Sequence, residues 1–128
     1  MNNDELLSAL AGKLQADPRL VAPCWARLVV VGNVEDSSES MHGFRIDTHG
    51  KAHPVAPSDI QIFALLRALR DAMAASDHKG RPWLTCLLAV TASGAIEGQF
   101  EYSDAHRWRI TPDNFIARSR EIVSWGAK

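Results

Sequence analysis

The sequence lacks the features that mark secreted and membrane proteins. Only two of its 128 residues are cysteines, Cys24 and Cys86, and neither has a CxxC partner, so we expect two free thiols that pack as small core hydrophobes. No apolar run approaches the length that spans a membrane, and the polar start of the chain, broken by Gly12, lacks the core of a signal peptide. These absences favour a cytoplasmic protein.

Strong net charge and nucleotide-binding motifs are missing as well. Fourteen Lys and Arg residues against fifteen Asp and Glu residues give a net charge of −1, which removes the usual electrostatic argument for nucleic-acid or membrane binding. Neither a P-loop nor a G-x-G-x-x-G sequence occurs. We therefore predict no cofactor and no direct nucleic-acid partner. One basic neighbourhood around Trp108 has a composition found in RNA-binding sites, namely Arg107, Arg109, Arg118 and Arg120.

What remains is the composition of an ordinary globular domain. Hydrophobic residues make up 46% of the chain and charged residues 23%, which is far from the composition of a disordered protein. A chain of 128 residues is long enough to bury a core without disulfides or metals. With no repeat and no linker in the sequence, we predict a single domain over residues 1–128.

The clearest structural pattern is a hairpin formed by two strands, Trp83–Thr91 and Ala95–Tyr102. A loop with an even number of residues would place the glutamates of the second strand beside the apolar residues of the first. A three-residue loop over residues 92–94 avoids this and puts Gly94 where a left-handed backbone is usually needed. The resulting cross-strand pairs are Val90 with Ile96, Cys86 with Phe100, and Leu84 with Tyr102.

This register leaves a second hairpin face of mixed polarity. It carries Trp83, Thr85, Leu87 and Ala89 from the first strand and Glu97, Gln99 and Glu101 from the second. Such a face is solvated, covered by other elements, or kept for a partner, and the sequence leaves these three alternatives open.

Three further strands or strand-like segments are expected. Residues Ala22–Val31 are rich in β-branched residues, and Phe44 and Ile46 alternate with polar neighbours before a turn at His49-Gly50. A short continuation covers Ala52–Val55. Between the first two lies the segment Gly32–Met41, which we expect to be a flexible acidic loop because it has no base among its acids, Glu35, Asp36 and Glu39.

Helical spacing predicts three helices. The first has Asn3 or Asp4 as its cap and ends at Asp17-Pro18. The second starts with a capping box of Ser58 and Gln61 and ends near residues 75–77. The third starts with Thr111 as its cap, ends at Gly126, and has an apolar side of Phe115, Ile116, Ile122 and Val123. Together these elements predict an α+β domain with an antiparallel sheet and helices packed mainly on one face.

The sequence contains only weak patterns for catalysis and metal binding. His42, His49 and His53 lie near Asp47, but His42 and His49 are an odd number of residues apart and would face opposite sides of a strand, so we predict no metal site. Glu97 and Glu101 would be about 13 Å apart, which is too far for a pair of glycosidase carboxylates. A pairing of Asp104 with His106 lacks a recognisable serine or cysteine nucleophile, so we predict no catalytic residues.

The order of motifs from residue 58 onward resembles that of YezG-type immunity proteins. In that family a helix leads to a Pro-Trp pair, a strand, a turn ending in Gly, and a strand ending in an aromatic-acid-aromatic tripeptide. The matching residues are Pro82-Trp83, Ser93-Gly94 and Phe100-Glu101-Tyr102. The resemblance implies a non-enzymatic antitoxin that binds and neutralises a polymorphic or contact-dependent growth inhibition toxin, often a nuclease.

These observations give one leading hypothesis and two alternatives. The leading one is an immunity protein that blocks the active site or substrate surface of a toxin through Glu35, Asp36, Glu39, Trp83, Glu97, Gln99 and Glu101. The first alternative is a small hydrolase or nucleic-acid-processing enzyme that uses Asp104, His106 and Arg107. The second is a scaffold that forms a weak homodimer through a sheet edge.

Overall fold

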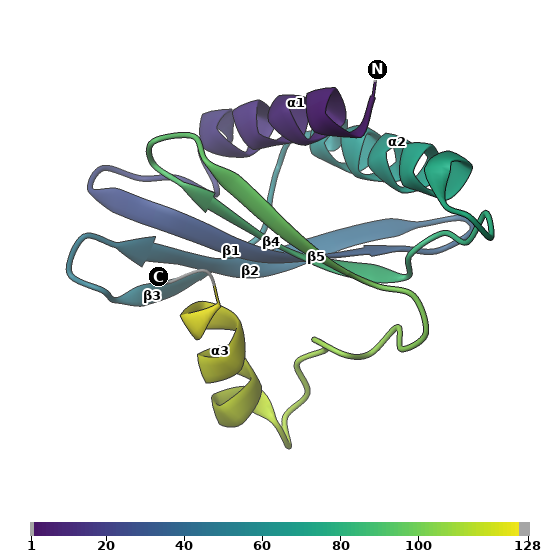
Figure 1. The fold of residues 1–128 in the computed structure, drawn as a ribbon. Coiled ribbons are helices and arrows are strands. Elements are labelled where there is room, and N and C mark those ends of the chain that lie inside the picture. Colours follow the sequence, from purple (N-terminus) through teal and green to yellow (C-terminus); the bar gives the residue numbers. More distant parts are fainter. Residues whose placement is uncertain (1, 126–128) are drawn as a thin grey trace.

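Five antiparallel strands form one sheet in the order β3-β2-β1-β4-β5, with α1 and α2 on one face and α3 on the other (Figure 1). The structure is a computed structural model, and it describes residues 2–125. The expected α+β fold with helices mainly on one face is therefore confirmed. The elements are α1 (Asn3–Ala16), β1 (Trp25–Val34), β2 (Glu39–Asp47), β3 (Ala52–Val55), α2 (Ile60–Ser76), β4 (Thr85–Thr91), β5 (Ile96–Glu101) and α3 (Phe115–Ser124).

The predicted hairpin of β4 and β5 has the expected register. Val90 lies opposite Ile96 and Cys86 opposite Phe100. The Thr91 N–H donates to the Ala95 carbonyl at 2.9 Å, which closes a three-residue loop, and Gly94 has the expected positive φ of 96°. The third predicted pair, Leu84 with Tyr102, lies just outside the two strands, because β4 begins at Thr85 and β5 ends at Glu101.

The loop predicted over Gly32–Met41 is wrong, because β1 and β2 continue through most of it. The turn has only four residues, 35–38, and is closed by a hydrogen bond of 2.8 Å from the Glu35 N–H to the Ser38 carbonyl. Val34 and Met41 are buried on the side of α1 and α2. Glu35 and Asp36 lie exposed in this turn, and Glu39 is half-buried at the start of β2. The polar composition of the segment therefore concealed the ends of both strands.

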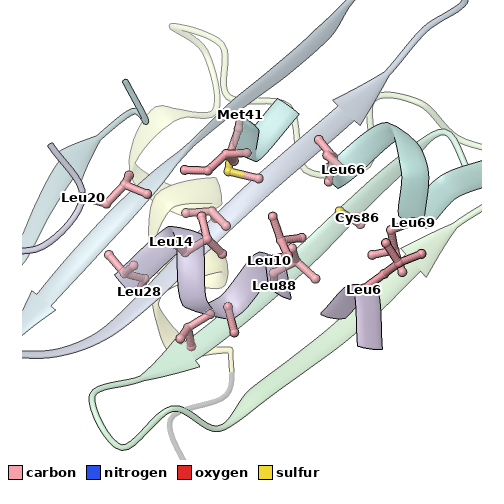
Figure 2. Packing of buried hydrophobic residues seen from close by; sticks show 14 of the residues in the cluster. Leu6, Leu10, Leu14, Leu20, Leu28, Met41, Leu66, Leu69, Cys86 and Leu88 are labelled. Carbon is pink, nitrogen blue, oxygen red and sulfur yellow. The ribbon is translucent and has the colours of Figure 1, made fainter. Parts of the chain in front are cut away.

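A tightly packed core fills the space between the sheet and the helix pair α1 and α2. Side chains from both helices and from three strands meet there, and most of them are fully excluded from solvent (Figure 2). Burying one leucine of this kind contributes about 1.5–3 kcal/mol. The labelled members are Leu6, Leu10, Leu14, Leu20, Leu28, Met41, Leu66, Leu69, Cys86 and Leu88.

A buried carboxylate joins the end of α1 to the start of α2. Asp17, which is 2% exposed, accepts hydrogen bonds from the Ser58 N–H at 2.7 Å, the Ser58 hydroxyl at 2.9 Å and the Asp59 N–H at 3.0 Å. Burial alone would raise the pKa of Asp17, but these donors and the Arg19 N–H outweigh it and lower the pKa.

This linkage explains why the predicted helix caps are shifted. The Ser58 hydroxyl donates to Asp17 and does not cap α2, so the predicted capping box is absent. Asp59 caps α2 instead, since its side chain accepts a hydrogen bond from the Gln61 N–H at 2.9 Å. The first helix is capped by Asn2, in a capping box with Glu5, instead of by Asn3 or Asp4.

The opposite face of the sheet is covered by the segment that follows β5. Trp108 and Ile122 lie over a second apolar cluster that includes Val31, Phe44 and Leu87. On α3 the predicted apolar side is only partly correct, because Ile122 is buried whereas Phe115 and Ile116 are 52% and 68% exposed.

The start of α3 also differs from the prediction. Asn114 precedes its first residue, and Thr111 instead donates its N–H to the Asn114 side chain at 2.7 Å. The predicted end at Gly126 lies outside the described residues.

The two cysteines have different environments. Cys86 is buried, and burial raises the pKa of its thiol to about 12. Cys24 was expected in the core but is exposed, in the turn that precedes β1, with a positive φ of 65°.

Candidate functional site

The acidic turn, residues 35–39, is anchored from the neighbouring helix α2. Arg67 of α2 forms an ion pair with Glu39 through Nε, and another of its nitrogens donates to the carbonyl oxygens of Glu35 and Ser38, the latter at 3.3 Å. The expectation of a flexible loop is therefore wrong. Glu39 is neutralised within the protein, and the backbone of the turn is fixed by a side chain that the sequence did not single out.

Glu35 and Asp36 are left to face solvent at the tip of this turn. Both side chains are exposed. Within residues 2–125, neither forms an ion pair with a base, although six other acids of that part of the chain do. These two carboxylates are consequently available to an incoming group.

Trp83 does not lie where the hairpin pattern placed it. Its side chain is 0% exposed and packs in the core beneath α1 and α2, with its ring centroid 5.5 Å from that of Phe100. The reason is that β4 begins only at Thr85, so the alternation of the strand does not extend back to Trp83. Its proposed role on a partner-binding surface is wrong.

The mixed face of the hairpin is covered over β4. Leu87 and Ala89 are buried in the cluster that contains Trp108, and the buried Thr85 hydroxyl donates to the Gly32 carbonyl at 3.1 Å. Of the three alternatives, coverage by other elements is thus correct for this strand.

Arg107 holds the polar end of the same face. It lies over the Trp108 ring at 4.9 Å and donates to Glu101 at 3.0 Å. The amide oxygen of Gln99, in the orientation that satisfies both groups, accepts from Arg107 at 2.9 Å. Hydrogen bonds from the Ser103 N–H and hydroxyl, together with that from Arg107, lower the pKa of Glu101 to about 2. Gln99 and Glu101 therefore stabilise the segment that follows β5.

Glu97 is the exposed acid of this face and lies apart from the others. It pairs in register with Ala89, whereas Glu101 pairs with Thr85 four residues along the sheet, at the end where the acidic turn lies. Four residues of strand correspond to about 13 Å. Glu97 consequently belongs to a different part of the surface from Glu35 and Asp36.

A cleft opens at the end of the sheet that carries the acidic turn. Its volume is about 530 Å³, within the range of ligand-binding pockets. We refer to it as the end cleft. Its lining comes from the β1–β2 hairpin, from α2, from the residue before β4 and from the segment after β5: Asn33, Val34, Glu35, Asp36, Ser40, His42, Arg70, Leu84, Ala105, His106, Arg109 and Ile110.

The end cleft carries both signs of charge on separate elements. Its acids, Glu35 and Asp36, come from the turn, whereas His106 and Arg109 come from the segment after β5. A further base in the lining, Arg70 of α2, forms an ion pair with Asp71 at 3.5 Å and donates to the Trp83 carbonyl at 3.3 Å. Arg109 lies 3.3 Å from the Nδ1 atom of His106. Since a guanidinium only donates, this contact requires an unprotonated Nδ1, which leaves the proton of the neutral ring on Nε2. His42, on the floor formed by β2, has a pKa lowered by burial.

The residues of the predicted enzyme alternative are not brought together for catalysis. The Asp104 carboxylate accepts from the backbone N–H of His106 at 2.9 Å. Arg107 is held by Glu101, and only His106 of the three lines the end cleft. Asp104 and Arg107 thus hold the protein's own structure together, through the His106 backbone and through Glu101.

The predicted histidine cluster is also dispersed. Among residues 2–125, no group of three or more His, Cys, Asp or Glu side chains is placed to hold a metal ion. His53 instead pairs with Asp47 at 3.0 Å, and hydrogen bonds from His53 and from the backbone of Lys51 and His49 lower the pKa of Asp47 to about 2.

The structure therefore defines a class of protein, namely a small α+β domain with a charged cleft at one end of an antiparallel sheet. Comparison with models of known protein families gives no match, and comparison with curated proteins gives no similar sequence. In the part of the chain that the structure describes, no helix is both long enough and apolar enough to cross a membrane.

Proposed function

We propose that the protein is an immunity protein that neutralises a toxin domain by binding it with the acidic turn and the rim of the end cleft. The observation that carries the proposal is the fixed presentation of Glu35 and Asp36 by Arg67. The order of motifs around Pro82-Trp83 and Phe100-Glu101-Tyr102, which resembles that of YezG-type immunity proteins, supports the same class of function.

The anchored turn favours tight association for an energetic reason. Ordering a loop at an interface consumes part of the binding free energy, at about 0.5–1.5 kcal/mol for each immobilised side chain. Here the hydrogen bonds from Arg67 to the carbonyls of Glu35 and Ser38 have already ordered the backbone. Two exposed carboxylates on a backbone that is held in this way are suited to a basic patch, such as the substrate-binding surface of a nuclease.

One observation favours the enzyme alternative. The imidazole of His106 borders a cleft of about 530 Å³ that also contains two carboxylates. If the protein is a hydrolase or a nucleic-acid-processing enzyme, the purified protein turns over a member of a broad panel of esters, phosphoesters and nucleic acids, and His106→Ala abolishes that turnover while the fold is retained.

The proposed function predicts that a gene beside this one encodes a large secreted protein with a toxic C-terminal domain, and the test uses that domain. That domain is titrated with the wild-type protein in a calorimeter, and its toxicity is measured with and without the protein. We expect a 1:1 complex and loss of toxicity. Reversing both charges in Glu35→Lys/Asp36→Lys should weaken the complex about a hundredfold, because close charge pairs across an interface contribute strongly.

The matched control is Glu97→Lys, which changes an exposed acid away from the end cleft. Its effect on affinity should be no more than about threefold, as is typical of a charge at or beyond the rim. Absence of any binding by the wild-type protein would contradict the proposed function. If Glu97→Lys weakened the complex as much as the double variant does, the interface would have to include the face of β5.

A further inference from the structure

From the charge distribution in the end cleft we infer that it receives a loop of the partner carrying one basic and one acidic side chain close together. This inference rests on the proposed function and specifies the chemistry of the partner surface. The base of the partner loop contacts Glu35 and Asp36, and its acid contacts Arg109 and the Nε2–H of His106.

The two charged walls of the end cleft do not neutralise each other. In residues 2–125, the carboxylates of Glu35 and Asp36 lie beyond 4.0 Å from every base, and Arg109 lies beyond 4.0 Å from every carboxylate. Both walls nevertheless line one cleft. The open space between them therefore separates opposite charges that an occupant can bridge.

A partner surface that carries charges of only one sign does not suit the end cleft. A purely basic patch that entered the end cleft would be attracted by Glu35 and Asp36 but repelled by Arg109. A purely acidic patch would experience the reverse. Since like charges brought together at an interface are costly, the favourable occupant presents both signs in the opposite order.

Hydrogen bonds hold the backbone of the basic wall, which is formed by His106 and Arg109. Arg109 is close to His106, and the backbone of His106 is held by the Asp104 carboxylate at 2.9 Å. A further hydrogen bond, from the Asn114 side chain to the Arg109 carbonyl at 3.1 Å, ties the same segment to the start of α3. A guanidinium with an imidazole N–H beside it offers several donors to one carboxylate.

The size of the end cleft agrees with such an occupant. A volume of about 530 Å³ admits a few side chains of a turn but not a folded element such as a helix with its side chains. The partner segment is accordingly a protruding loop or hairpin tip.

The decisive experiment is Arg109→Glu, titrated against the same toxin domain. The bipolar cleft predicts at least about tenfold weaker binding, since the acid of the partner loop then meets a carboxylate. A simple acidic surface that binds a basic toxin predicts the opposite, tighter binding. Lys51→Glu makes the same change in net charge in the β2–β3 turn, at the far end of β2 from the end cleft, and should leave the affinity within about twofold.

The outcomes separate the inference from the proposed function. If Glu35→Lys/Asp36→Lys weakens the complex but Arg109→Glu leaves it unchanged or tightens it, the toxin is bound and the bipolar cleft is refuted. If the wild-type protein does not bind the domain, both fail. Arg109→Gln, which removes the charge without adding a new one, serves if Arg109→Glu does not fold, and it should weaken binding by about threefold or more.

Discussion

The two faces of the sheet are covered in different ways. On one face, α1 and α2 supply a row of leucines that are fully buried against β1 and β4. On the other, an irregular segment and the ten-residue α3 provide the cover (Figure 1). Among the described residues of α3, only Ile122 is buried. The first face is packed closely against two helices, whereas the second is only partly covered, and this leaves the end cleft open.

Stability and recognition are assigned to different faces of this sheet. Regular helices bury much apolar area for each residue that they order, so the face of α1 and α2 contributes most of the stability. The segment after β5 buries Trp108 and otherwise exposes charged side chains such as His106 and Arg109. Irregular segments held on a rigid scaffold are where binding residues commonly lie.

The largest loss of stability is expected from a substitution in the core between the sheet and the helix pair α1 and α2. Leu66→Ala removes a fully buried side chain from the centre of the helix–sheet core. It should lower the free energy of unfolding by about 2–5 kcal/mol, because the loss of transfer free energy adds to the cost of a cavity. Urea unfolding followed by circular dichroism measures it. A loss below about 1 kcal/mol would show that this core is looser than its burial indicates.

A smaller and more local loss of stability is expected from a substitution on the face that α3 covers. Ile122→Ala also removes a fully buried side chain, but it is the one buried residue among the described residues of α3, so we expect α3 to open locally while the sheet and the helix pair remain folded. We expect a loss of only about 1–2 kcal/mol, with faster amide exchange confined to α3 and the segment before it. Uniformly faster exchange throughout β1 and β4 would contradict the separation of the two faces.

The smallest change in stability is expected from the hydrogen bonds that link β5 to the segment after it, and this change depends on pH. The pKa of Glu101 is lowered to about 2 from an ordinary value of 4.5, so its hydrogen bonds stabilise the folded state above pH 4.5 and lose that contribution as the pH falls towards 2. Glu101→Gln should therefore be less stable than the wild-type protein at neutral pH, and the difference should shrink in acid. The amide shift of Ser103 in the wild-type protein should titrate with a midpoint near the lowered pKa. A midpoint at the ordinary value would show that the contacts to Ser103 and Arg107 are not formed.

Most of the secondary structure was predictable from the sequence, for local reasons. The register of β4 and β5 followed from the alternation of apolar residues and from Gly94, which are properties of adjacent residues. The limits of β1 and β2 were not predictable in the same way, because exposed acids in a hairpin have the composition of a loop. Trp83 was misplaced because a strand pattern does not indicate where the strand begins.

The candidate site was predicted only in part. Glu35 and Asp36 were identified from the absence of bases around them, and they are exposed as expected. The partners that neutralise Glu39 and Glu101 come from residues 28 positions away, Arg67, and 6 positions away, Arg107. Arg109 appeared in the sequence only as one of four arginines near Trp108, with nothing to indicate that it shares a cleft with the acidic turn.

The class of fold, the central hairpin and the presence of two exposed acids follow from alternation, turn residues and charge, because these features act over short distances along the chain. Three other features depend on how distant elements pack: which acids are neutralised, which face of the sheet each tryptophan joins, and that a base and an acid line the same cleft. The physical reason is that ion pairs and burial depend on distances between elements, and these distances are fixed only when the helices and the segment after β5 pack on the sheet.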